Sequence, residues 1–144
     1  MPLSDGFLAW RDWCKQQPQF DVGKLFLRGN KQLTVEEAAA YNAPFPDKGY
    51  RAALRAFPPM VPEFEDSEGA ALSRQARDFW RNDWQGQSLM AIGQQDPVLG
   101  DAVMRVLQDQ IRGCPEPLWL PHAGHFVQEK GREIAQAAVR HFQL

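Results

Sequence analysis

An acid and a histidine are placed where they could form part of a hydrolytic active site. Asp96 directly follows a predicted strand, and His125 lies between another predicted strand and the last predicted helix. The carboxyl ends of neighbouring parallel strands lie on the same side of a sheet, which is where open α/β sheets bind ligands. We therefore expect Asp96 to accept a hydrogen bond from one ring nitrogen of His125, leaving the other nitrogen as a general base.

Each of the two residues also has a structural explanation. Asp96 could begin an Asp-Pro turn, and His125 could fill the first turn of a helix. Taken together, an acid followed by a histidine near the C-terminus matches the chain order of α/β-hydrolases, which favours a catalytic pair. His122 and His141 are the rival bases, and we expect both at the surface.

A hydrolase of this kind also needs a nucleophile on a sharp strand-to-helix turn earlier in the chain. The sequence contains no G-x-S-x-G segment. None of the four candidate nucleophiles follows a predicted strand with small residues around it: Ser4, Ser67, Ser73 and Cys14. The 144 residues are therefore expected to hold half of an active site.

The elements that must position the pair follow an α/β pattern. Apolar runs at 88–93 and 117–120 predict buried strands, and they alternate with a helix over 69–82, a helix from Asp101 to Gly113 and a last helix after His125. The two later helices should bury apolar stripes, formed by Val103, Val106, Leu107 and Ile111 and by Val127, Ile134, Ala135, Ala138, Val139 and Phe142. Since three or more strands are usually needed for a stable sheet, this pair should require a partner.

Residues 1–64 differ in character and hold seven of the eleven prolines. Thr34 and Glu37 form a predicted capping box for a helix that continues to Tyr41, and a second short helix is expected over 47–55. Seven aromatic rings here either form ordinary core or line an apolar cavity: Phe7, Trp10, Trp13, Phe20, Phe26, Phe45 and Phe57. Short helices joined by proline turns are thus predicted before the α/β part at 65–144.

Composition excludes several classes of protein. A net charge of −2 offers no large field to attract nucleic acid or anionic lipid. No apolar run approaches the roughly 20 residues that span a bilayer, and the first six residues lack the pattern of a signal peptide, so we expect a cytoplasmic protein. Cys14 and Cys114 have no metal-ligand spacing, which indicates neither a metal site nor a disulfide bridge.

Seven segments, in chain order, resemble the C-terminal half of haloalkane dehalogenases whose cap domain supplies a halide-binding tryptophan. They are DGFLAW (5–10), APFPD (43–47), FPPMV (57–61), FWRNDW (79–84), MAIG (90–93), GCPEP (113–117) and AGHFVQE (123–129). The resemblance implies part of a helical cap domain at 1–64, followed at 65–144 by the C-terminal part of an α/β-hydrolase main domain. It implies no cofactor.

The resemblance also assigns roles to single residues. His125 looks like the catalytic histidine, Asp96 like the acid that orients it, and Trp10 like the cap tryptophan that donates to the departing halide. Residues that look like the apolar substrate pocket are Phe7, Phe57, Pro58, Val61, Val98, Leu99 and Phe126. The ligands implied are a small haloalkane, water and halide.

In the family, an aspartate displaces halide to form an alkyl ester, and the histidine activates water to hydrolyse it. Neither that aspartate nor the second halide-binding tryptophan has a match in this sequence, so the isolated chain is expected to give no turnover. It should need the N-terminal half of such an enzyme, or self-association, to cover its sheet. The alternatives are an epoxide hydrolase, for which Tyr41 and Tyr50 are the available cap tyrosines, and a noncatalytic truncated product or interaction module.

Overall fold

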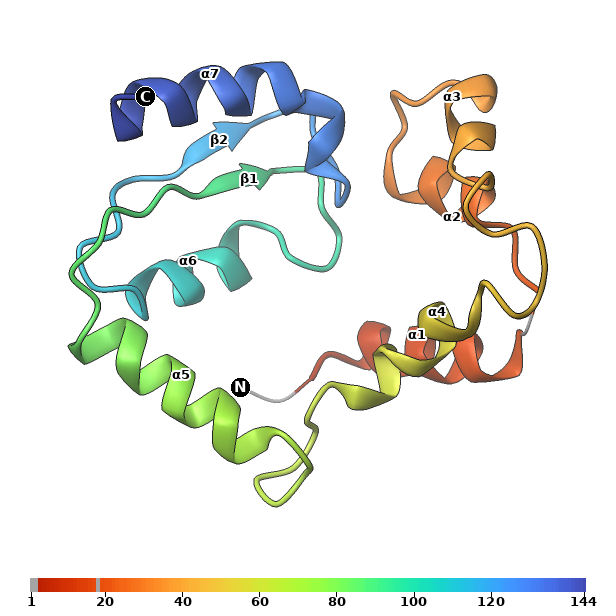
Figure 1. Ribbon diagram of the computed structural model, residues 1–144, viewed down its shortest axis with the longest axis horizontal. Coiled ribbons are helices and arrows are strands. Elements are labelled where there is room, and N and C mark those ends of the chain that lie inside the picture. Colours follow the sequence, from red (N-terminus) through yellow and green to blue (C-terminus); the bar gives the residue numbers. More distant parts are fainter. Residues whose placement is uncertain (1–2, 18) are drawn as a thin grey trace. The chain divides into compact units, whose positions relative to one another are not determined.

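The computed structural model describes residues 3–17 and 19–144. The chain divides into two compact units, Met1–Arg74 and Gln75–Leu144, and Figure 1 traces the elements of each. The division at 64/65 that the sequence suggested stays a prediction. No helix in the described part of the chain is both long and apolar enough to cross a bilayer.

The first unit consists of short helices, and the first three of them have side-chain N-caps. Its elements are α1 (Asp5–Gln16), α2 (Val22–Gly29), α3 (Val35–Ala40), α4 (Ala52–Ala56) and the 3₁₀ turn η1 (Pro58–Met60). Ser4 and Asp21 cap α1 and α2, two helices that the sequence analysis did not identify. The predicted capping box of α3 is confirmed, since Thr34 and Glu37 exchange both side-chain hydrogen bonds.

A polar network joins α2 to α3. The Asp21 carboxylate accepts from Asn42 Nδ2 at 2.9 Å, and Asn42 Oδ1 accepts from the N–H of Gly23 at 3.1 Å. A Cβ on Gly23 would lie only 2.5 Å from the carbonyl oxygen of Ala38, so glycine is required for this close approach. The pKa of Asp21 is lowered, mainly by the hydrogen bond from Asn42 and next by the one from the backbone N–H of Lys24.

The helix predicted over 47–55 begins later than expected. α4 starts at Ala52, because the Asp47 carboxylate instead accepts from the N–H of Gly49 at 2.7 Å and forms a turn. Such side-chain-to-backbone bonds compete with helix formation. The prediction was therefore wrong for the first five residues of this helix.

The second unit is built on two parallel strands, β1 (Ala91–Gly93) and β2 (Leu118–Leu120), with Ile92 opposite Trp119. The flanking elements are α5 (Ala70–Asn82), which the two units share, α6 (Asp101–Asp109), the 3₁₀ turn η2 (Val127–Lys130) and α7 (Gly131–Phe142). α6 and α7 lie on either side of the strand pair (Figure 1). The predicted order strand, helix, strand, helix is confirmed.

The boundaries predicted for α6 were wrong at both ends. Gly100 is the N-cap and makes no side-chain capping bond, whereas Asp101 is the first helical residue and accepts from Gln94 Nε2 at 3.2 Å. The helix ends at Asp109, and Gly113 lies in the following turn with a φ of +70°. A positive φ is unfavourable for residues with a Cβ, which explains why this position is a glycine.

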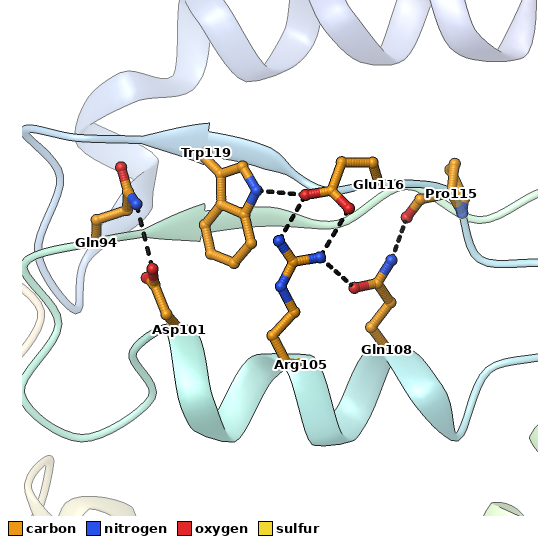
Figure 2. Close-up of polar contacts among 7 residues, drawn as sticks. All are labelled: Gln94, Asp101, Arg105, Gln108, Pro115, Glu116 and Trp119. Carbon is orange, nitrogen blue, oxygen red and sulfur yellow. Dashed lines mark hydrogen bonds and ion pairs between the residues drawn. The ribbon is translucent and has the colours of Figure 1, made fainter.

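A charged network fastens α6 to β2 (Figure 2). Arg105 forms a bidentate pair with Glu116, both bonds at 2.7 Å, and its guanidinium lies 4.5 Å from the centre of the Trp119 ring. The Trp119 indole N–H donates to Glu116 at 2.7 Å. Arg105 and then Trp119 lower the pKa of Glu116 to about 2, and Glu116 raises the pKa of Arg105.

The predicted burial of the α6 and α7 stripes is wrong. Val106, Leu107 and Val139 are 46%, 45% and 48% exposed. The buried apolar residues with side chains described in the second unit are Met90, Ile92, Pro117, Leu120 and Ala123. The strand pair is too narrow to cover both helices, which leaves their apolar faces half in solvent.

The aromatic rings of the first unit do not form one core. Of the seven singled out, Phe20 is buried, whereas Phe57 is 65% exposed. The fully buried side chain of α1 is Cys14, and burial raises the pKa of its thiol. The interpretation of all seven rings as ordinary core is therefore wrong.

Candidate active site

Asp96 and His125 meet beyond the carboxyl ends of the two strands. His125 Nδ1 lies 2.9 Å from Asp96 Oδ2, and Asp96 Oδ1 accepts from the N–H of Val98 at 2.8 Å. The aspartate side chain is 6% exposed and the histidine side chain 37% exposed. Because a carboxylate only accepts, the contact assigns the proton to Nδ1 and leaves Nε2 as an acceptor.

The parallel register brings the two loops together. Beyond β1, the N–H of Gln94 donates to Leu120 at 3.1 Å and the N–H of Gln95 donates to Ala123 at 2.9 Å. A Cβ on Gly93 would collide with the carbonyl oxygens of Ala123 and of the residue after it. The glycine at the end of β1 thus allows the histidine loop to lie directly against the acid loop.

His125 has a ring nitrogen available for chemistry. No residue in the described part of the chain hydrogen-bonds its Nε2, and the Phe126 ring packs edge-on against the imidazole at 5.2 Å between centroids. An imidazole oriented through one nitrogen by a carboxylate can take a proton from water through the other. The geometry fits a general base and an acid that orients it, and these roles of His125 and Asp96 stay a prediction.

The other two histidines, His122 and His141, do not pair with a carboxylate in the described structure. His122 is exposed in the turn after β2. His141 lies in the last turn of α7 against the ring of Phe142, and its buried Nε2 has no hydrogen-bond partner. Among the described histidines, His125 alone pairs with a carboxylate.

Trp10 lies on α1 in the first unit and is 37% exposed. Its ring packs at a tilt against Phe7, with 5.8 Å between centroids. No described residue accepts its indole N–H. The side chain therefore has a donor to offer, and its role at a halide stays a prediction.

The predicted pocket residues divide between the two units. Phe7, Phe57, Pro58 and Val61 belong to the first, where Pro58 is buried and Val61 is 37% exposed. Val98 and Leu99, each 44% exposed, follow Asp96, and Phe126 follows His125. The last three thus flank the acid and base, while the pocket role of all seven stays a prediction.

Two features of the second unit were missed by the sequence analysis. Gln95 binds the loop that leads to His125, and Gly93 allows that loop to approach closely. The only sequence signal for either residue was its position just before Asp96. A separate cavity of about 330 Å³ is lined by Trp84, Gln85, Gly86, Arg112 and Gly113, none of which was a predicted site residue.

Within the described residues, no group of three or more histidines, cysteines and acids could hold a metal.

Known proteins similar to this chain are haloalkane dehalogenases. That of Mycobacterium marinum is 33% identical over 135 residues, which are 92% of this chain and 45% of the relative. That of Psychrobacter cryohalolentis is 31% identical over 96% of this chain and 46% of the relative. No family model matches the sequence.

Solved structures agree with these relatives. The tetrameric haloalkane dehalogenase DpaA from Paraglaciecola agarilytica superposes with a TM-score of 0.86 at 39% identity, over 95% of this chain and 46% of that one. DatA from Agrobacterium tumefaciens gives a TM-score of 0.69 at 26% identity, over 94% and 50%.

These similarities confirm the resemblance seen in the sequence. The chain spans slightly less than half the length of the curated relatives it matches. It is similar to the C-terminal part of haloalkane dehalogenases and has the fold of the corresponding part of an α/β-hydrolase. The relatives are named haloalkane dehalogenases, which favours this interpretation over an epoxide hydrolase.

Proposed function

We propose that this chain supplies the base, the orienting acid and one halide donor of a haloalkane dehalogenase-type hydrolase. The reaction converts a small haloalkane and water to an alcohol and halide through an alkyl ester. The observation that carries the proposal is the 2.9 Å contact between His125 and Asp96 at the carboxyl ends of two parallel strands.

His125 would act in the second half of the reaction. Its Nε2 takes a proton from water while the oxygen of that water attacks the ester carbonyl. The ester bond then breaks, the alcohol leaves with the proton that His125 Nε2 had taken, and the carboxyl group that carried the alkyl group releases the second proton of the water to solvent, which regenerates the carboxylate. Asp96 stabilises the imidazolium that forms, through the hydrogen bond from Nδ1.

Trp10 would act in the first half. A neutral haloalkane offers no charge to bind, so its recognition requires an apolar cavity, and the halide that forms requires N–H donors directed at it. The indole N–H of Trp10 is such a donor. The seven predicted pocket residues would supply the apolar walls, with the halide and the alkane length left open.

The carboxylate that carries the alkyl group would come from polypeptide beyond these 144 residues. A sheet of two strands is rarely stable without further strands. We therefore propose that the N-terminal half of a dehalogenase, on the same or another chain, or a second copy of this chain covers the strand pair. The 144 residues would give no turnover without the nucleophile.

Complementation tests the proposal. The chain is mixed or co-expressed with a polypeptide that spans the N-terminal half of the Mycobacterium marinum relative, and halide release from 1-haloalkanes is measured. We expect release only when both are present, and a fall of about 10²- to 10⁴-fold in His125→Ala, the contribution of a general base. His122→Ala, at an exposed histidine outside the site, should retain the activity.

Two results would contradict the proposal. One is halide release from the chain alone that His125→Ala abolishes, since the nucleophile would then lie within the chain. The other is a complemented His125→Ala protein as active as the unaltered one.

A further inference from the structure

Gln95, the residue before Asp96, binds the loop after β1 to the loop after β2 at two points. Its backbone N–H donates to Ala123 at 2.9 Å, and its side-chain Nε2 donates to the carbonyl oxygen of Pro121 at 3.0 Å. Both acceptors lie in the short segment between β2 and His125. Among the described residues, the side-chain hydrogen bonds found between these two loops are this one and the bond between His125 and Asp96.

The acid and the histidine are held to different degrees. Asp96 is fixed within its own loop, since its N–H donates to Gly93 at 3.2 Å and its Oδ1 accepts from the N–H of Val98 at 2.8 Å. His125 lies outside helices and strands, and its side chain makes one hydrogen bond in the described structure, that to Asp96. The position of the imidazole therefore depends on the segment that leads to it from β2.

We propose that Gln95 is a positioning residue for the acid–base pair. Its side-chain amide holds the segment 121–125 so that His125 Nδ1 stays opposite Asp96 Oδ2. This inference rests on the proposed function only in treating the pair as catalytic. Gln95 contacts neither the reacting atoms nor the imidazole, and it acts through the backbone that carries His125.

The preceding glutamine is a matched control. Gln94 is also exposed, but its Nε2 donates to Asp101 at 3.2 Å, at the start of α6 (Figure 2). Gln94→Met and Gln95→Met remove the same amide from neighbouring positions. Both variants keep the backbone hydrogen bonds to Leu120 and Ala123. They differ in the side-chain bond that is lost, because only that of Gln95 reaches the segment before His125.

The test is the tautomer of His125, read from its ring ¹⁵N shifts by NMR at a pH where the ring is neutral. In the unaltered chain, we expect the Nδ1–H tautomer to predominate because Asp96 accepts from it. Gln95→Met should lower the ratio of the Nδ1–H to the Nε2–H tautomer by about 2- to 10-fold, as expected for the loss of one supporting hydrogen bond. Gln94→Met should leave the ratio unchanged.

Three results would overturn the inference. One is the same tautomer ratio in both variants and in the unaltered chain, and another is an unaltered chain in which the Nδ1–H tautomer does not predominate. The third is a Gln95→Met variant that no longer melts cooperatively, since Gln95 would then be needed for the fold. The outcome is independent of catalysis. A shifted ratio in Gln95→Met together with a complemented His125→Ala protein as active as the unaltered one would support the positioning role and refute the catalytic role proposed for His125.

Discussion

Gly93 is the residue on which the geometry of the site most directly depends. It ends β1 where the backbone of Ala123 and Gly124 passes so closely that any side chain would collide with their carbonyl oxygens. Backbone atoms cannot rotate away as a flexible side chain can. An alanine would therefore push the histidine loop away from the acid loop.

We expect Gly93→Ala to lower the free energy of unfolding of the second unit by about 1–3 kcal/mol, the usual cost of overpacking. Denaturant unfolding measures this change. Gly131→Ala is the control, because Gly131 begins α7 with φ −53° and a Cβ there meets nothing within 4 Å. It should be neutral or stabilising, and equal losses in both variants would refute the steric explanation.

The ion pair beside Trp10 offers a second prediction. Arg11 Nη2 lies 2.7 Å from Glu63 Oε2, with side chains 14% and 30% exposed, and the bond joins α1 to the segment after η1. Glu63→Gln should lower the free energy of unfolding by about 1–3 kcal/mol, because it leaves a largely buried guanidinium with a weaker partner.

Another ion pair on α1 is the control for Glu63→Gln. Lys15 and Asp12 are 51% and 60% exposed and 3.7 Å apart, so Asp12→Asn should change stability by less than about 1 kcal/mol. Thermal or denaturant unfolding of both variants decides the matter. A loss in Asp12→Asn as large as that in Glu63→Gln would show that burial does not distinguish the two pairs.

At the scale of elements, the capping box of α3 should account for a measurable part of that helix's stability. Thr34 accepts from Glu37 N–H at 3.2 Å, and the Glu37 carboxylate accepts from Thr34 N–H at 2.9 Å, which lowers the pKa of Glu37. Thr34→Ala should cost about 1 kcal/mol in the free energy of unfolding, whereas Thr34→Ser, which keeps a hydroxyl, should cost much less. Indistinguishable unfolding curves for the two variants would contradict this.

The link between α6 and β2 should depend on pH. Arg105 and Trp119 lower the pKa of Glu116 from 4.5 to about 2. A carboxyl whose pKa is depressed by folding stabilises the folded state above its unfolded pKa, and this contribution is lost as the pH falls from about 4.5 through about 2. Glu116→Gln should flatten the pH dependence of unfolding in that window, and an unchanged slope would show that the pair does not contribute.

The elements that the sequence predicted well were those whose signals are local. The Thr34 and Glu37 pair specifies the start of α3 by two short-range bonds, and the helix over 69–82 was found nearly in full. α1 and α2 were missed although Ser4 and Asp21 are ordinary N-cap residues. Those two signals were present in the sequence and could have been used.

Other features could not be predicted because they depend on neighbours distant in the chain. Asp101 is a good capping residue by type, yet its carboxylate binds the side chain of Gln94 from the loop before it. The contact between Asp96 and His125 followed from the expected parallel pairing, but the contributions of Gly93 and Gln95 follow from how closely two loops approach. A linear pattern carries no measure of that distance.

At the scale of the whole chain, burial was the property least readable from sequence. Apolar periodicity on α6 and α7 shows which face each helix turns toward a partner, but not whether that partner is present. Two strands offer too little surface, so Val106 and Val139 remain about half exposed, at 46% and 48%. Apolar faces left open on both flanking helices are typical of a surface that contacts further polypeptide.

These open faces lead to a prediction about the chain in solution. We expect its sedimentation coefficient to rise with protein concentration, because apolar faces of neighbouring molecules associate. The double variant Val106→Lys, Val139→Lys should sediment as a monomer over the same range, since lysine keeps the helix and removes the apolar contact. Val35→Lys is the control, because Val35 is a single 68% exposed valine at the start of α3 and its replacement should leave association unchanged. A chain that is monomeric at every concentration and melts in one sharp transition would mean that the second unit needs no covering, and the proposal that further polypeptide completes its sheet would then be wrong.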